Sequence, residues 1–229
     1  MFFDPLYFLF LAPAILLAVV AQIMVQAAYA QGRSVPARMS GFAAARQILD
    51  ANGLENVEIE QVPGHLSDHY DPRDKVLRLS PEVYHGNSAS SVGIAAHEAG
   101  HALQDAYHYA PLFIRNMAVP IANFGSSFGV FMLMIGVGFG LKWLAMAGVV
   151  LFAAVAFFQI VNLPVEFNAS SRAKLALAEL GIVGQDEMYY VRKVLNAAAL
   201  TYVAATLQSV LTLLYYLVRL GFFSSRRDD

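Results

Sequence analysis

A group of residues near the middle of the chain has the types and spacing of a metal-dependent hydrolytic centre. His97, Glu98 and His101 stand in the segment HEAGH, which fits the pattern HExxH. Side chains four residues apart project from one face of a helix, so both imidazoles can bind a single tetrahedral Zn²⁺. The glutamate beside the first histidine can then act as a general base toward water on the metal. The pattern arises by chance in about one chain in a hundred of this length, but here small residues flank it on a predicted helix, which favours the zinc interpretation.

Two histidines leave a zinc site incomplete, so a third ligand must come from elsewhere in the chain. The metzincin extension HExxHxxGxxH is absent, because Gln104 and Tyr107 occupy its glycine and last histidine positions. Glu166 is the better candidate, since it ends a long apolar segment, where a carboxylate is costly unless it faces the protein interior, water or a metal. Pro164 is expected to break the helix just before Glu166 and to help aim its side chain.

The other histidines are weaker candidates for the metal. His65, His69 and His85 lie in a polar segment and are expected to be solvated, although each stays an alternative ligand. His108 lies two turns beyond His101 and is displaced around the helix, so it is expected at an interface or on the surface.

The composition is that of a membrane protein. Of the 229 residues, 58% are hydrophobic and 14% are charged, against about 25% charged in typical globular proteins. The mean hydropathy is +0.52. A net charge of -2 gives no basic field for nucleic-acid binding, and the absence of cysteine excludes disulfides, thiol catalysis and zinc–cysteine sites.

Four charge-free stretches are long enough to cross a bilayer, which takes about 20 apolar residues. They cover residues 5–32, 116–141, 143–165 and 194–218. The fourth carries several polar side chains and is predicted either to cross the membrane or to lie at its interface. The second and third meet in a tight turn at Lys142 and Trp143, residue types that are common at membrane interfaces.

Small residues recur along the second stretch at a spacing that allows close helix approach. They are predicted to pack within the chain, with a homo-oligomer or a membrane partner as the alternative; they are Gly125, Gly129, Gly136 and Gly140.

The polar segment between the first two stretches is predicted to mix helix and strand. A short helix covers 41–51, and strands are expected at 57–62, 66–70 and 75–79, with a turn at 71–74, as a small meander. The HExxH helix follows, capped by Ser88 or Ser90 and ending before Pro111. We therefore divide the chain into an anchor (1–32), a catalytic region (33–115), a transmembrane hairpin (116–165), a helical region with the third ligand (166–193), and a fourth transmembrane or interfacial helix with a tail (194–229).

HEAGH on a helix between the first two spans and LPVEFNASSRA after the third resemble the YugP-type membrane zinc metallopeptidases of bacteria, the neutral zinc metallopeptidase family. The similarity covers nearly the whole chain. It implies a gluzincin with His97, His101 and Glu166 as ligands of one Zn²⁺ per chain and Glu98 as catalytic base. The CAAX-prenyl and heat-shock membrane proteases are more distantly similar and place an aspartate four residues after the third ligand. Ser170 stands there in this chain and can hydrogen-bond a ligand imidazole without adding charge.

The expected fold is therefore a mostly α membrane protein with three to four transmembrane helices and a zincin-like α+β catalytic region. The expected function is hydrolysis of a peptide or membrane-protein substrate, with Tyr70, Asn168 or Arg172 as oxyanion donor and an exposed strand edge as peptide-binding surface. One alternative is an intramembrane protease of the site-2 type, although its later Asp-Gly motif is absent. The other is a scaffold whose structural zinc has a fourth protein ligand.

Basic residues predict the orientation in the bacterial cytoplasmic membrane. The loops on the side of the HExxH segment are rich in them, whereas the N-terminus has none, so the catalytic face is expected in the cytoplasm and the N-terminus outside. The basic residues on the catalytic side are Arg33, Arg38, Arg172, Lys174, Arg192 and Lys193. Basic residues near the C-terminus argue against its lying outside, so either the fourth stretch does not cross or the other loops outweigh them; they are Arg219, Arg226 and Arg227.

Overall fold

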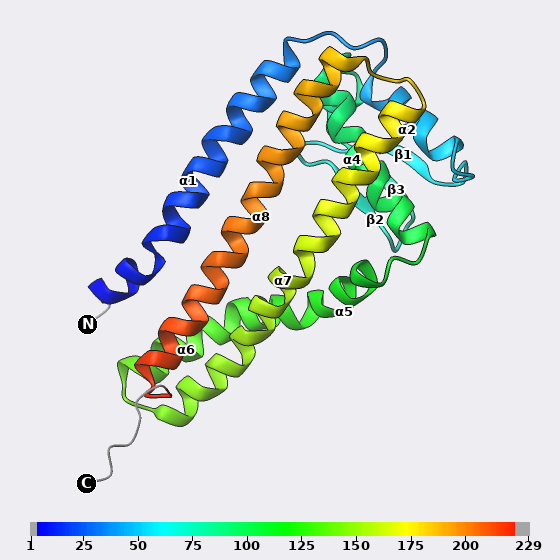
Figure 1. The fold of residues 1–229 in the computed structure, drawn as a ribbon. Helices are drawn as coiled ribbons and strands as arrows, with labels where there is room; N and C mark the ends of the chain where they lie inside the picture. Colours follow the sequence, from blue (N-terminus) through cyan, green and yellow to red (C-terminus); the bar gives the residue numbers. More distant parts are fainter. Residues whose placement is uncertain (1–3, 223–229) are drawn as a thin grey trace. The chain divides into compact units, whose positions relative to one another are not determined.

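The fold was analysed in a computed structural model, which describes residues 4–222 and is mostly helical (Figure 1). Residues 223–229 of the predicted tail lie outside this range. The elements are α1 (Pro5–Arg33), α2 (Gly41–Asp50), β1 (Glu58–Gln61), β2 (His69–Asp71), β3 (Val76–Leu79), α3 (Pro81–Tyr84), α4 (Ala89–Ala106), α5 (Ala110–Phe124), the π-helical turn η1 (Gly125–Gly129), α6 (Val130–Gly138), α7 (Lys142–Glu179) and α8 (Gln185–Arg219). The predicted class, a mostly α protein with a small α+β region, is confirmed.

Within residues 4–222, four helical segments are long and apolar enough to cross a membrane. They are α1, the continuous segment Ala110–Gly138 formed by α5, η1 and α6, then α7 and α8. The fourth stretch, which the sequence left open between crossing and lying at the interface, is thus part of a 35-residue helix with the length and composition of a span.

The chain divides into two compact units. Of the residues described, the first contains 4–20, 114–163 and 201–222, and the second contains 21–113 and 164–200.

In the first unit, the glycines of the second span pack against α7. A Cβ atom on Gly125 or Gly136 would collide with the backbone of Leu151 or Ala145, so only glycine fits at these contacts. Gly129 also lies against α7, whereas Gly140 is in the turn after α6 with a φ of 70°. Gly125, Gly129 and Gly136 therefore make contacts within the chain.

The two ends of the helical chain also meet in the first unit. The hydroxyl of Tyr215 donates a hydrogen bond to Asp4 Oδ2 at 2.5 Å, and Arg219 Nη2 lies 3.7 Å from the same oxygen. The beginning of α1 and the end of α8 are thus neighbours, as expected if the chain crosses the bilayer an even number of times.

In the second unit, α2 packs on α4, which also contacts β2 and β3, and α2, α4 and β3 share one hydrophobic core (Figure 1). The core includes Ile48 of α2, Leu77 of β3 and Val92 of α4, each with no exposed surface. Burial of each such side chain contributes about 1.5–3 kcal/mol. Polar caps begin both helices, since the Ser40 hydroxyl accepts from Ala43 N and the Ser88 hydroxyl accepts from Ser91 N.

The three predicted strands are present, but their order differs from that of a meander. The order is β1-β3-β2, with β1 parallel and β2 antiparallel to β3. The central strand, β3, is the most buried of the three, and its Leu77 and Leu79 belong to the hydrophobic core. His69–Asp71 form the outer strand beside α4.

One local prediction about Pro164 is wrong. The helix does not break there, because α7 runs without interruption from Lys142 to Glu179. A proline within a membrane helix removes one backbone hydrogen bond, and neighbouring groups can compensate for it. Glu166 is therefore positioned by a continuous helix rather than by a helix end.

Candidate metal centre

Three side chains from two helices that are distant in sequence converge in the second unit. α4 presents His97 and His101 one turn apart, and α7 presents Glu166. The Nε2 atoms of the two histidines lie 3.3 Å and 3.6 Å from Glu166 Oε2. The ligand atoms of His97, His101 and Glu166 all lie within 4.8 Å of one another, so these three residues could hold a metal ion. Among residues 4–222, no other group of three or more histidine or carboxylate side chains meets this criterion.

Small residues bring α4 and α7 together at this point. A Cβ atom on Gly100 would lie 2.6 Å from the carbonyl oxygen of Ala169, which is too close for a real contact. Ala96, Ala99 and Ala169 have no exposed surface. The absence of bulk between the helices lets the carboxylate of α7 reach the imidazoles of α4.

The second nitrogen of each imidazole also has a partner. His97 Nδ1 lies 3.1 Å from the Ser170 hydroxyl, and His101 Nδ1 lies 3.0 Å from Gln104 Oε1. With Nδ1 engaged in this way, Nε2 of each ring is directed toward the carboxylate. Such contacts orient the histidine rings of metal sites.

Glu98 lies beside this group and is half-buried. The pKa of Glu98 is raised to about 7, mainly by burial and also by the negative charges of Glu166 and Asp68, while His97 and a hydrogen bond from the backbone N–H of Tyr70 oppose the rise. The carboxyl group of Glu98 is thus next to His97 in the chain and in contact with the backbone of β2.

Comparison with known proteins agrees with this geometry. A family model described as "Putative neutral zinc metallopeptidase" matches residues 7–221. The chain belongs to this zinc metallopeptidase family. The "Putative membrane protease YugP" of Bacillus subtilis (strain 168) is 46% identical over 190 residues, which is 83% of this chain and 83% of that protein. No solved structure matches the chain significantly.

The family resemblance inferred from the two motifs is thus confirmed, and the membrane character of the chain is supported by its four apolar helices. The donor set also suits the metal that the family name implies. Ligands at about 2.0–2.2 Å from a tetrahedral zinc ion lie roughly 3.3–3.6 Å from one another. The separations of 3.3 Å and 3.6 Å between imidazole nitrogens and carboxylate oxygen match this range. Two histidines and one glutamate are also a common ligand set of catalytic zinc.

Tyr70 is one of the predicted oxyanion donors, and its backbone N–H is hydrogen-bonded to Glu98. Its hydroxyl donates a hydrogen bond to Asp105 Oδ2 at 2.9 Å, which ties β2 to the end of α4. Burial, together with this hydrogen bond, raises the pKa of Tyr70 well above its usual value, so the hydroxyl stays protonated and remains a donor.

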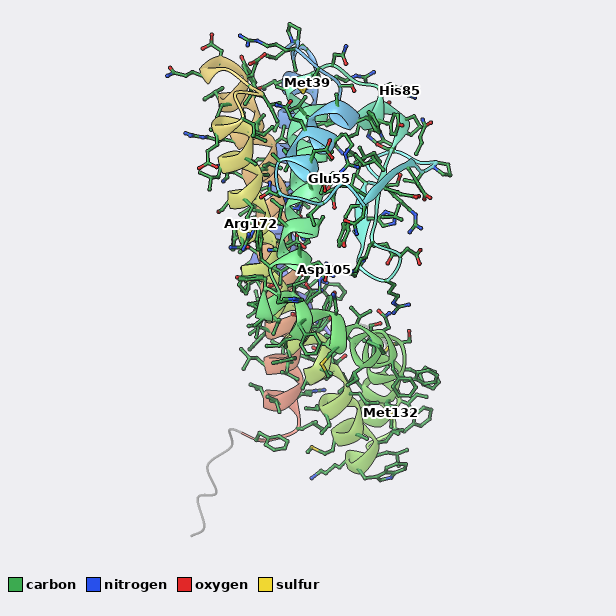
Figure 2. The ribbon with its side chains drawn as sticks, turned by 90° about the vertical axis from the view of Figure 1, so that its right-hand side faces the viewer. Met39, Glu55, His85, Asp105, Met132 and Arg172 are labelled. Atoms are coloured by element: carbon green, nitrogen blue, oxygen red, sulfur yellow. The ribbon has the colours of Figure 1, made fainter. Side chains whose placement is uncertain are left out.

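Asn168 and Arg172, the other two candidates, belong to a hydrogen-bond chain along α7. Asn168 Oδ1 accepts from Gln104 Nε2 at 3.0 Å and from Arg172 Nε at 2.8 Å. The Arg172 guanidinium also lies over the rings of Tyr107 and Tyr109, at 5.5 Å and 5.9 Å from their centroids. Figure 2 marks Arg172 on α7 and Asp105 on α4. An oxyanion role for any of these residues stays a prediction.

The other histidines have local partners. His65 Nδ1 lies 3.1 Å from Glu82 Oε2, His69 Nδ1 lies 2.8 Å from the Ser67 carbonyl oxygen, and the His85 ring packs on Tyr84. His108 is exposed in the turn after α4 with a φ of 51°. Within residues 4–222, none of these histidines belongs to the metal-ligating group.

Gln104 is the residue of this centre that the sequence analysis missed. It was noted only as a departure from the metzincin pattern. The available signal was its spacing, because positions 97, 101 and 104 lie on one helix face. A polar residue there would point between α4 and whatever carries the third ligand.

Proposed function

We propose that the chain is an integral-membrane zinc endopeptidase in which His97, His101 and Glu166 hold one Zn²⁺ and Glu98 acts as general base. The observation that carries this proposal is the convergence of two imidazoles and one carboxylate at zinc-ligand separations beside a further carboxylate. A zinc ion bound there supplies Lewis acidity, which polarises a scissile carbonyl and lowers the pKa of water.

Residues of the chain transfer the proton and orient the ligands. Glu98 accepts a proton from the attacking water and returns it to the leaving amine. Ser170 and Gln104 contact Nδ1 of His97 and His101, respectively, so that neither ring must reorient during the reaction.

The outer strand β2 offers a surface for an extended peptide. It pairs with β3 along one edge only, and the backbone N–H of Tyr70 is hydrogen-bonded to Glu98. A peptide added along this edge, as in other strand-addition complexes, would run past the catalytic carboxylate.

Two observations favour this proposal over its alternatives. A structural zinc site is closed by four protein ligands, whereas three gather here among the residues described. A site-2 type protease carries HExxH within a span, but α4 is not among the helices of residues 4–222 that are long and apolar enough to cross. We place the protein in the bacterial cytoplasmic membrane with its catalytic face in the cytoplasm.

Substitution of the general base tests the proposal. Glu98→Gln should keep zinc, as measured by mass spectrometry, and should lower cleavage of casein or a membrane-protein substrate in detergent by at least about 100-fold. Glu55→Gln is the matched control, because Glu55 is exposed in the loop before β1 (Figure 2). Undiminished cleavage by Glu98→Gln, or a wild-type protein without zinc, would refute the proposed function.

A further inference from the structure

Gln104 lies between α4 and α7 with no exposed surface. Its side-chain amide makes three hydrogen-bond contacts, with His101 Nδ1 at 3.0 Å, the carbonyl oxygen of Val165 at 2.7 Å and Asn168 Oδ1 at 3.0 Å. A buried amide with partners on both helices is unusual enough to call for a role beyond filling space.

We infer that Gln104 is a positioning residue, which fixes the tautomer and ring orientation of His101 and ties that ligand to the turn of α7 that carries Glu166. The inference rests on the proposed zinc-binding function. It assigns to Gln104 no contact with substrate or metal.

The direction of these hydrogen bonds is determined by the backbone. The carbonyl oxygen of Val165 can only accept, so the Gln104 amide nitrogen must face α7. The amide oxygen then faces His101 and can only accept, so Nδ1 of that ring must carry the proton. The lone pair of neutral His101 is therefore on Nε2, the atom that lies 3.6 Å from Glu166 Oε2.

His97 lacks such a constraint. Its Nδ1 atom faces the hydroxyl of Ser170, which can rotate and either donate or accept. Either tautomer of His97 is compatible with this contact. Of the two partners, Gln104 is therefore the one that restricts its histidine, His101, to a single tautomer.

The same amide joins two ligands. Val165, whose carbonyl oxygen it contacts, directly precedes Glu166 in α7. Asn168 Oδ1 accepts from both Gln104 and Arg172, so the amide is held from the side of α7 as well. A shift of the Gln104 side chain would therefore change the position of His101 relative to the helix of Glu166.

Two substitutions separate positioning from simple packing. Gln104→Met keeps the length of the side chain and removes all three hydrogen bonds, so zinc affinity should fall by about 10- to 100-fold. Gln104→Glu keeps an oxygen that accepts from His101 Nδ1 and, in its neutral form, an O–H group that can donate to the Val165 carbonyl oxygen, so it should lose less affinity than Gln104→Met. Gln47→Met is the matched control, because Gln47 is exposed on α2.

The measurements are made on the full-length protein in detergent. Zinc affinity is obtained by competition with a chromophoric chelator, the ligand geometry from the visible bands of the Co²⁺-loaded protein, and folding from thermal unfolding of the metal-free protein. We expect altered Co²⁺ bands for Gln104→Met and smaller changes for Gln104→Glu.

The pattern of outcomes distinguishes the inference from the proposed function. Wild-type affinity in Gln104→Met, or an equal loss of affinity in Gln104→Glu, overturns the positioning role while the zinc site itself stands. Failure of the wild-type protein to bind zinc overturns the proposed function and this inference together.

Discussion

Gly100 is where the backbones of α4 and α7 meet at the metal centre, and Gly100→Ala tests whether that approach sets the ligand geometry. The added Cβ would lie 2.6 Å from the carbonyl oxygen of Ala169 and 3.3 Å from its Cα. These are backbone atoms of a helix and cannot rotate away. Restoring a contact of 3.4 Å requires the helices to separate locally by about 0.8 Å.

The expected effect on stability is small, because two terms oppose each other. Alanine is favoured over glycine inside a helix by about 1 kcal/mol, whereas overpacking costs about 1–3 kcal/mol. The net loss should be about 0–2 kcal/mol. The effect on function should be larger, since His97 and His101 move with α4 while Glu166 moves with α7. A misplacement near 1 Å can lower the rate about 100-fold.

Gly93→Ala is the matched control on the same helix. Its Cβ would lie 3.2 Å from a side-chain methyl of Val191, which can yield by a few tenths of an ångström. The assays are kcat/KM on casein, zinc affinity by chelator competition and the thermal unfolding midpoint, all in detergent. If Gly100→Ala keeps wild-type kcat/KM and zinc affinity, close approach of the backbones is not what positions the ligands.

Three further results are expected. Glu166→Ala should lose both zinc and activity, whereas His108→Ala should keep both, because His108 is exposed in the turn after α4; stoichiometric zinc in Glu166→Ala would place the third ligand elsewhere. Dialysis against a chelator should abolish wild-type cleavage and added Zn²⁺ should restore it, and activity that survives complete metal removal would contradict the mechanism. With a cytoplasmic catalytic face, Ser67→Cys should react with an impermeant maleimide only after the cells are permeabilised. Phe139→Cys, in the exposed turn between α6 and α7, should react in intact cells, and the reverse labelling would invert the orientation.

Much of the metal centre could be predicted from local spacing and the cost of charge. Helix periodicity alone places His97 and His101 on one face. The presence of Glu166 at the end of an apolar stretch indicated a carboxylate that needs a partner. Both inferences use properties of a few neighbouring residues, and the structure brings these three side chains together.

The hydrogen-bond partners of these residues depend on tertiary packing, so they could not be predicted from local spacing. The role of Gln104 follows from a backbone carbonyl 61 residues away on α7. The strand pattern indicated which side chains face the core, but it does not specify which strand pairs with which, and β1 joins β3 rather than β2. The uninterrupted helix at Pro164 likewise reflects its surroundings and not the intrinsic preference of proline.

The distance along the chain between HExxH and Glu166 also has a consequence for biosynthesis. A complete membrane hairpin separates α4 from the turn of α7 that carries the third ligand. At roughly 5–20 residues per second, translation of the roughly 65 residues between His101 and Glu166 takes about 3–13 s. During that interval the nascent chain has His97, Glu98 and His101 but lacks Glu166. Under the proposed function, zinc loading and proteolytic activity therefore wait until the hairpin has been synthesised and α7 has joined α4.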